Sequence, residues 1–332
     1  MAVRFAETHD VRVVPIIGLN HVQTIYDMLY MRGIDLGIVH SDVLEYMART
    51  TGYPRVYQRI SSLVELWTQK VAIIAGEQYR SLADLEGQKV NFRAPGKGSD
   101  VTGTILFDAV GIEVEPTRFD ELEALEKVKS GEIAATVYVI EEPIEAFTSL
   151  SPADEVRLLG LPQSDALLAH YRAAELTQAE FPELIKGDGA VLSLAVPVIL
   201  AGYNWPRSDN VRYEKARRFA AALVDGLDEL KETHPERWGN VSLDRDVPNV
   251  QRLWMIDDVL AERAATVERE AEAEREQEAA AAAARTAELR AEQERLMAQL
   301  SERLQSGSAG AEELAELERL IEQFRQLLGE EQ

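Results

Sequence analysis

Apolar and polar positions alternate along the first three quarters of the chain with the periods of short buried strands and amphipathic helices. Strands are predicted at 11–18, 34–39, 63–74, 89–92, 114–119, 133–140, 156–160 and 190–201. Helices are predicted at 20–31, 43–49, 82–87, 122–129 and 213–230, with a further helix that ends at Gly111. Because strands and helices take turns, the pattern predicts an α/β fold with a parallel sheet.

The pattern changes at about Ile256. From there on the chain is rich in Ala, Glu, Arg, Gln and Leu and contains no proline, which is typical of long helix. Leucine stripes at 289–304 and 314–328 lie on either side of a Ser/Gly break at 306–310. This region is predicted to be a helical hairpin or a coiled coil, paired either within one chain or between chains.

A glycine-containing loop follows the strand at 89–92 and opens the helix behind it. Gly96 ends the strand, Gly98 lets backbone approach a ligand, and Ser99 or Asp100 is the predicted helix cap. A helix N-terminus carries unpaired N–H groups and a partial positive charge, so the loop predicts a place for a carboxylate or phosphate. The alternative is that the two glycines only turn the chain.

Two better-known glycine loops do not fit. A P-loop needs glycine where Asn91 stands and serine or threonine where Gly98 follows Lys97. A dinucleotide loop could start at Gly96 and Gly98, but its third glycine is replaced by Val101.

The composition argues against several classes of partner. The formal net charge of −23 and the pI near 4.7 argue against nucleic acid and against an anionic membrane surface. There is no cysteine, hence no disulfide, thiol nucleophile or Cys-based zinc site. No stretch approaches 18 consecutive apolar residues, and residues 1–10 lack the apolar core of a signal peptide. As written, the chain is therefore expected to be soluble and unexported, with no insertion into the membrane.

Catalytic constellations are missing from the sequence. It contains neither Gly-x-Ser-x-Gly nor His-Glu-x-x-His, and its five histidines lack ligand spacing. His21 and His40 each follow a predicted strand, which leaves a paired metal site as an alternative. Glu141 and Glu142 could act as acid and base, but a charged pair before proline is more typical of a solvated turn. We therefore predict no enzyme, no cofactor and no metal.

Six segments together resemble the TAXI-type solute receptors of TRAP transporters: 13–18 (VVPIIG), 29–43 (LYMRGIDLGIVHSDV), 84–92 (DLEGQKVNF), 96–99 (GKGS), 131–138 (GEIAATVY) and 203–206 (YNWP). The resemblance covers most of residues 11–255. It implies a two-lobed, type 2 periplasmic-binding-protein fold whose lobes close on a small carboxylate, glutamate-like or a dicarboxylate. It also implies TRAP membrane subunits as partners and a periplasmic location. The implied domains are lobe I at 1–75, lobe II at 76–188, a return to lobe I at 189–255, and the helical tail at 256–332.

The resemblance also implies ligand-binding residues. Gly96, Gly98 and Ser99 match the family's Gly-Ser-Gly-Thr loop, with Lys97 in place of a small residue. That lysine either adds charge to the anion site or points to solvent.

On the facing lobe, Ser41 and Asp42 match a Gln-Ser-Asp turn in which His40 replaces glutamine. Asn20 and His21 stand where the family has glycine and serine, and Tyr138 matches a strand end that faces the cleft.

The front of the chain departs from the family, whose members begin with a signal peptide, a first strand and a glycine-rich loop. Either the start codon is misassigned or the protein is a reduced relative that stays in the cytoplasm. The second possibility leads to an alternative function, an interaction protein in which a degenerate receptor fold is oligomerised by the tail at 256–332.

Overall fold

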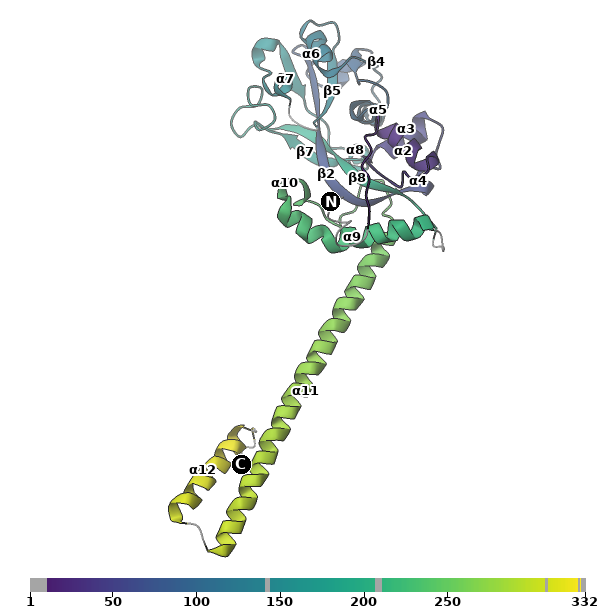
Figure 1. Cartoon of the computed structure of the whole chain (residues 1–332). Helices are drawn as coiled ribbons and strands as arrows, with labels where there is room; N and C mark the ends of the chain where they lie inside the picture. The colour runs from purple at the N-terminus through teal and green to yellow at the C-terminus, as the bar shows by residue number, and fades with distance from the viewer. Residues whose placement is uncertain (1–10, 141–143, 207–210, 308–309, 328, 330–332) are drawn as a thin grey trace. The chain divides into compact units, whose positions relative to one another are not determined.

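The computed structural model describes residues 11–140, 144–206, 211–307, 310–327 and 329. The chain forms two compact units, Met1–Leu260 and Ala261–Gln332 (Figure 1). The candidate acid–base pair Glu141 and Glu142 lies outside the described residues.

The first unit is built on a mixed sheet of eight strands in the order β1-β8-β2-β5-β3-β4, with β6 paired to β2 and β7 paired to β8. The strands are β1 (Leu36–His40), β2 (Ile60–Gly76), β3 (Lys89–Asn91), β4 (Glu115–Thr117), β5 (Ala135–Ile140), β6 (Val156–Leu159), β7 (Arg172–Leu176) and β8 (Val191–Tyr203).

Helices cover the sheet. They are α2 (His21–Tyr30), α3 (Val43–Thr50), α4 (Val56–Arg59), η1 (Leu82–Leu85), α5 (Gly98–Val110), α6 (Glu121–Lys129), α7 (Glu145–Thr148), η2 (Pro152–Asp154), α8 (Asp165–Leu168), α9 (Val211–Thr233) and α10 (Pro235–Trp238). Helix α5 stops where predicted, because Gly111 takes the left-handed backbone conformation, with φ 70°, that glycine adopts without strain.

Two long strands tie the unit together. β2 and β8 pair antiparallel from Ile60↔Tyr203 to Lys70↔Ala195, and β2 runs through the middle of the unit in Figure 1. Near one end they pack in a core with α9, and near the other they pack in a core with α5. The predicted α/β fold of two lobes joined by crossover strands is thus confirmed.

The predicted parallel sheet is wrong in its centre. β2 pairs antiparallel with β5, β6 and β8, and β1 also pairs antiparallel with β8. Among the strands of the described residues, the parallel pairs are β3 with β4 and β3 with β5. The reason is that β2 and β8 each cross the whole unit and pair directly with antiparallel neighbours. Parallel neighbours would need strand–helix–strand crossovers.

The strand predicted at 11–18 does not form. Within the part of the chain that the structure describes, this segment pairs with no other strand. Val11 and Val13 still pack against the core beside α9, whereas Ile16 is 68% and Ile17 100% exposed. An alternating pattern becomes a strand only with a partner's backbone to pair with, and Pro15 has no N–H to offer one.

The last helix of the first unit runs on into the second. α11 (Trp254–Ser306) begins with Met255, Ile256 and Val259 buried in the core beside α9. The apolar core therefore continues slightly past the predicted start of the tail. None of the described helices is both long enough and apolar enough to span a membrane.

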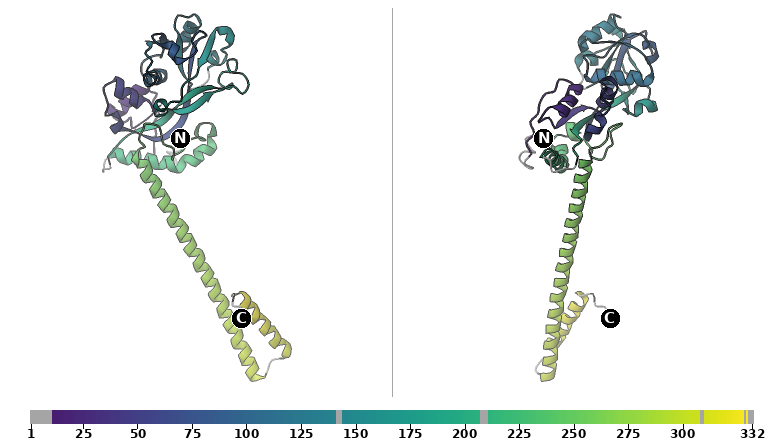
Figure 2. Two further views of the ribbon diagram at one scale, coloured as in Figure 1. Left: turned by 180° about the vertical axis from the view of Figure 1, so that it is seen from behind. Right: turned by 90° about the vertical axis from the view of Figure 1, so that its right-hand side faces the viewer.

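The second unit is a helical hairpin. α12 (Ala311–Leu327) turns back toward α11, as both views of Figure 2 show. Ile321 is 5% exposed, and Arg303 pairs with Glu313 at 3.3 Å. The other stripe residues that are half-buried are Leu289, Leu296, Leu300, Leu314, Leu317 and Phe324. Of the two predicted pairings, the structure has the one within the chain; Leu328 lies outside the described residues.

Candidate ligand site

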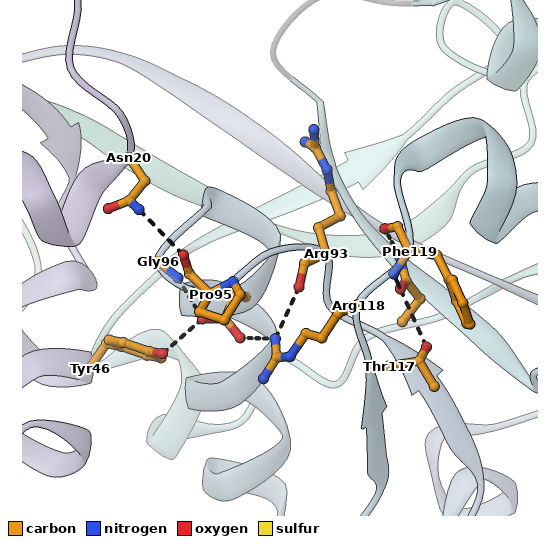
Figure 3. A network of polar contacts seen from close by, with 10 residues as sticks. Asn20, Tyr46, Arg93, Pro95, Gly96, Thr117, Arg118 and Phe119 are labelled. Atoms are coloured by element: carbon orange, nitrogen blue, oxygen red, sulfur yellow. Dashed lines mark hydrogen bonds and ion pairs between the residues drawn. The ribbon is translucent and has the colours of Figure 1, made fainter.

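The loop between β3 and α5 meets the start of α2. The His21 N–H donates to the Gly96 carbonyl at 3.1 Å, and the Asn20 side-chain amide donates to the Pro95 carbonyl at 3.3 Å (Figure 3). The Lys97 ammonium donates to the Leu19 carbonyl at 3.1 Å, so its side chain is held by the chain and does not simply point to solvent. Main-chain and side-chain hydrogen bonds thus hold the predicted loop against the segment that the resemblance placed on the facing lobe.

The predicted cap of α5 is wrong. The helix begins at Gly98, its N-cap is Lys97, and no side chain caps it, so Ser99 and Asp100 lie inside the first turn. The Asp100 carboxylate instead reaches back to the loop, where its Oδ2 accepts from the Gly96 N–H at 2.8 Å.

Asp100 has further partners around the loop. The Tyr46 hydroxyl donates to its Oδ2 at 2.7 Å, and Arg118 donates to its Oδ1 (Figure 3). Burial, together with this carboxylate, raises the pKa of Tyr46 to about 12. One anion position at the loop is therefore filled by the chain's own carboxylate.

His21 and His40 lie face to face at the same place. Their ring centroids are 4.1 Å apart, and the His40 N–H donates to Nδ1 of His21 at 3.4 Å. Burial above all, then the charges of His40 and Lys97, lowers the pKa of His21 to about 2, so its imidazole is neutral. Because Nδ1 of His21 accepts a main-chain hydrogen bond, it is not free to ligate a metal. The described residues hold no group of three potential metal ligands.

The turn after β1 carries buried polar atoms without partners. They are Nδ1 of His40, Oγ of Ser41 and Oδ1 of Asp42, each in a residue at most 3% exposed. Leaving such an atom buried without a hydrogen-bond partner lowers stability by about 1–3 kcal/mol. The other Asp42 oxygen, Oδ2, accepts from the Thr102 hydroxyl at 2.8 Å and from the Tyr171 hydroxyl at 3.0 Å.

The N-terminal end of α5 supplies hydrogen-bond donors beside residues 40–42. None of the described residues accepts a hydrogen bond from the N–H groups of Gly98, Ser99 and Asp100. Gly98 lies so close to His40 that a Cβ at this position would be 2.5 Å from Cε1 of the imidazole. Only glycine therefore allows the helix end and the turn to approach each other.

Tyr138 is placed apart from the other predicted residues. Its ring stacks on Phe147 at 4.1 Å, within a core cluster that also contains residues of α6. The remaining predicted residues come together at the junction of loop, turn and helix end: Asn20, His21, Ser41, Asp42, Gly96, Gly98 and Ser99. Sequence reasoning missed Gln69, Thr102 and Tyr171, which hold this junction from other elements.

An open pocket of about 440 Å³ lies elsewhere, lined by Glu45, Tyr57, Val247, Asn249, Val250 and Gln251. Its carboxylate is already engaged, because Glu45 accepts hydrogen bonds from Arg49 and Tyr57. An acidic wall of this kind does not suit an anionic ligand.

The burial of Asp42 leads to a prediction about how stability depends on pH. Burial raises its pKa above the ordinary 3.8, against the opposing effects of His40, Thr102 and Tyr171. The folded chain thus holds this proton to higher pH than the unfolded chain, so stability is greatest below the ordinary carboxyl pKa and declines as pH rises toward the folded one. Asp42→Asn removes this decline. We expect the variant to be more stable at pH 7 by on the order of 1–3 kcal/mol.

Urea unfolding of both proteins between pH 3 and 7 measures this difference. The extra stability of Asp42→Asn over the parent should shrink as the pH falls to the ordinary pKa of a carboxyl group. A variant that is less stable than the parent at pH 7 would show that the hydrogen bonds to the Asp42 carboxylate outweigh the cost of burying it.

Comparison with solved structures finds several periplasmic binding proteins. The aliphatic sulphonate binding protein SsuA of Escherichia coli is 16% identical, with a TM-score of 0.39 over 70% of this chain and 67% of its own. A TctC solute binding protein from Polaromonas is 12% identical, with a TM-score of 0.35 over 66% of this chain and 76% of its own.

A protein of Methylobacillus flagellatus KT described as a periplasmic sulfonate-binding protein is 12% identical, with a TM-score of 0.37 over 64% of this chain. The match spans 56% of that protein's length. These similarities are too distant to indicate a ligand.

A comparison with protein families identifies the family of this chain. The NMT1-like family matches residues 22–246, a span that contains the loop at 96–99, the turn at 40–42 and both crossover strands. Members of this family are solute-binding proteins and not enzymes, in line with the prediction from the missing catalytic constellations. Because the match covers more than half of the 332 residues, the chain belongs to the NMT1-like family.

Proposed function

We propose that this chain binds a small carboxylate-bearing solute, glutamate-like or a dicarboxylate, where the first turn of α5 meets the turn at 40–42. One observation carries the proposal: the unpaired N–H groups of Gly98 and Ser99 lie at a helix end whose Gly98 backbone packs against the buried His40 ring, and the next residue, Ser41, has a buried hydroxyl without a partner. A carboxylate is an acceptor for all of these donors, and a helix N-terminus favours negative charge.

The strength of such a site is adequate for a receptor. Micromolar affinity corresponds to about 8 kcal/mol. Two or three hydrogen bonds to a charged group contribute about 1.5–3 kcal/mol each, and the solute also relieves polar atoms that are unpaired without it. These gains offset the loss of freedom on binding, which costs at least about 4 kcal/mol.

The hydrogen bonds from Asn20, His21 and Lys97 give the site a means of closure. They join the loop to the start of α2, so the junction is shut while they are made. We propose that they break to admit the solute and form again over it, as in other two-lobed binding proteins that close on their ligands.

The cellular role proposed here is that of an extracytoplasmic receptor of the TAXI type, which delivers its solute to the membrane subunits of a TRAP transporter. The proposal is supported by the resemblance of the six segments together with membership in a family of solute-binding proteins. The alternative, an interaction protein oligomerised by its tail, has less support. The apolar stripe of the tail is covered in part within the chain, because Ile321 of α12 is buried in the hairpin.

Gly98→Ala tests the site. The added methyl group must displace the His40 imidazole, so we expect the dissociation constant of a bound carboxylate to rise at least about tenfold and stability to fall by about 1–3 kcal/mol. Thermal-shift screening of amino acids, dicarboxylates and keto acids identifies the solute, and titration calorimetry compares the variants. Gly160→Ala is the matched control, because nothing lies within 4 Å of a Cβ there.

Two results would contradict the proposal. In the first, no carboxylate stabilises the parent protein. In the second, Gly98→Ala folds and binds as tightly as Gly160→Ala, which would place the solute away from the helix end.

A further inference from the structure

We propose that Gln69 is a positioning residue that sets the specificity of this site. By holding His40 in one tautomer, it makes the site prefer carboxylates with a hydrogen-bond donor on the neighbouring carbon, 2-amino and 2-hydroxy acids, over the corresponding 2-keto acids. The inference rests on the proposed function, because it concerns the solute bound at the same junction.

The tautomer follows from the partners of the His40 ring. Nε2 lies 2.5 Å from Oε1 of Gln69, and both residues are buried, at 0% and 7% exposure. A neutral imidazole has one N–H donor and one bare acceptor nitrogen. If Nε2 donates to the Gln69 oxygen, Nδ1 is the bare acceptor. The opposite tautomer would bury an N–H at Nδ1 with nothing to receive it, since the nearest carboxylate oxygen, Oδ1 of Asp42, is 3.9 Å away.

Two buried acceptors, one imidazole nitrogen and one oxygen of the ionised carboxylate, then lie close together. Nδ1 of His40 and Oδ1 of Asp42 are 3.9 Å apart, and neither has a partner. One ammonium or hydroxyl group can lie about 2.9 Å from both atoms, because their separation is less than twice a normal hydrogen-bond length. The carbonyl oxygen of a keto acid has no hydrogen to donate and would meet two acceptors.

The donors for the carboxylate lie next to these acceptors. The Gly98 backbone approaches the His40 ring so closely that its missing Cβ would lie 2.5 Å from Cε1, the carbon bonded to Nδ1. A carboxylate on the N–H groups of Gly98 and Ser99 therefore lies within one small molecule of the acceptor pair. An oxygen or nitrogen on the carbon next to the carboxylate has the reach to meet both acceptors. A site whose buried acceptors stay unpaired discriminates against the ligand that fails to pair them.

The test uses ligands that differ only in this group. Dissociation constants of the full chain are measured by calorimetry for L-glutamate, 2-hydroxyglutarate and 2-oxoglutarate, and for alanine, lactate and pyruvate. In whichever of the two series binds, we expect the dissociation constants of the amino acid and the hydroxy acid to be at least about tenfold lower than that of the keto acid. Gln69→Met, which cannot accept strongly from Nε2, should reduce this preference to less than about threefold, whereas Gln69→Glu, which only accepts, should keep it.

Nitrogen-15 chemical shifts of His40 give a second readout that a merely structural role of Gln69 would not move. They should show Nε2 protonated in the parent and in Gln69→Glu, and a changed tautomer population in Gln69→Met. Equal affinities for the keto and donor-bearing acids in the parent, or an unchanged preference in Gln69→Met, overturn the inference and leave the carboxylate site standing. If no carboxylate binds the parent, the proposed function itself fails.

Discussion

Asp100→Ala is expected to lower the free energy of unfolding of the first unit by about 3–5 kcal/mol. The side chain is fully buried, and it gathers three donors from separate segments: the Gly96 N–H, the Tyr46 hydroxyl and the Arg118 guanidinium. Alanine leaves all three without their acceptor. The Gly96 N–H is buried and bears its full desolvation penalty, whereas the half-buried Tyr46 hydroxyl bears part of its own.

Chemical unfolding followed by tryptophan fluorescence measures this loss. Asp108→Ala is the control on the same helix, because that carboxylate is 54% exposed and lies 3.8 Å from its one cationic neighbour, Arg49. The control should change stability by less than about 0.5 kcal/mol. Similar losses in the two variants would mean that the loop is held by its backbone alone.

Most of the local structure around the site could be predicted because it depends on residues close in sequence. The strand at 89–92, the glycine loop and the helix stop at Gly111 each follow from short-range rules on apolar alternation and left-handed glycine. The cap of α5 could not be predicted. Ser99 and Asp100 both suit the position, and the Asp100 side chain turns away from it to meet Tyr46, 54 residues earlier.

The strands show the same limit. The segment at 11–18 has the pattern of a strand and lacks a partner. By contrast, β7 (RAAEL) has neither apolar–polar alternation nor a β-branched residue, and it becomes a strand because it pairs along β8 from Arg172↔Ala195 to Leu176↔Val191. Pairing, not the intrinsic preference of the segment, decides both cases.

The residues that complete the candidate site come from far along the chain. Thr102 is 60 residues from Asp42 and Tyr171 is 129 residues from it, while Gln69 meets His40 across 29 residues. A sequence shows which side chains need partners when buried, but not which distant segment will supply them. A motif predicts Asp42 as a site residue, but its buried, unsatisfied oxygen results from the packing of α5 and Tyr171 around it.

A second ionic group holds the crossover strand. Glu65 lies on β2 between two register shifts, and its carboxylate is fully buried. Arg172 of β7 donates to one oxygen at 2.5 Å, and Arg245 donates to the other at 3.1 Å. Arg172 also donates to the Asp246 carbonyl at 2.7 Å, which ties the segment around Arg245 to the sheet.

Glu65→Ala is expected to lower stability by about 3 kcal/mol, near the lower end for a broken buried ion pair, because the two arginines are 33% and 43% exposed and regain some water. Arg172→Ala should rank next, since it leaves the buried carboxylate with one cation and also frees the Asp246 carbonyl. Arg245→Ala should cost least. Glu175→Ala, an exposed glutamate on the same strand as Arg172, is the control and should stay within about 0.5 kcal/mol. The ranking separates two accounts of the group. If Arg172→Ala costs more than Glu65→Ala, the arginine holds β7 chiefly through the Asp246 carbonyl, and the buried carboxylate is secondary.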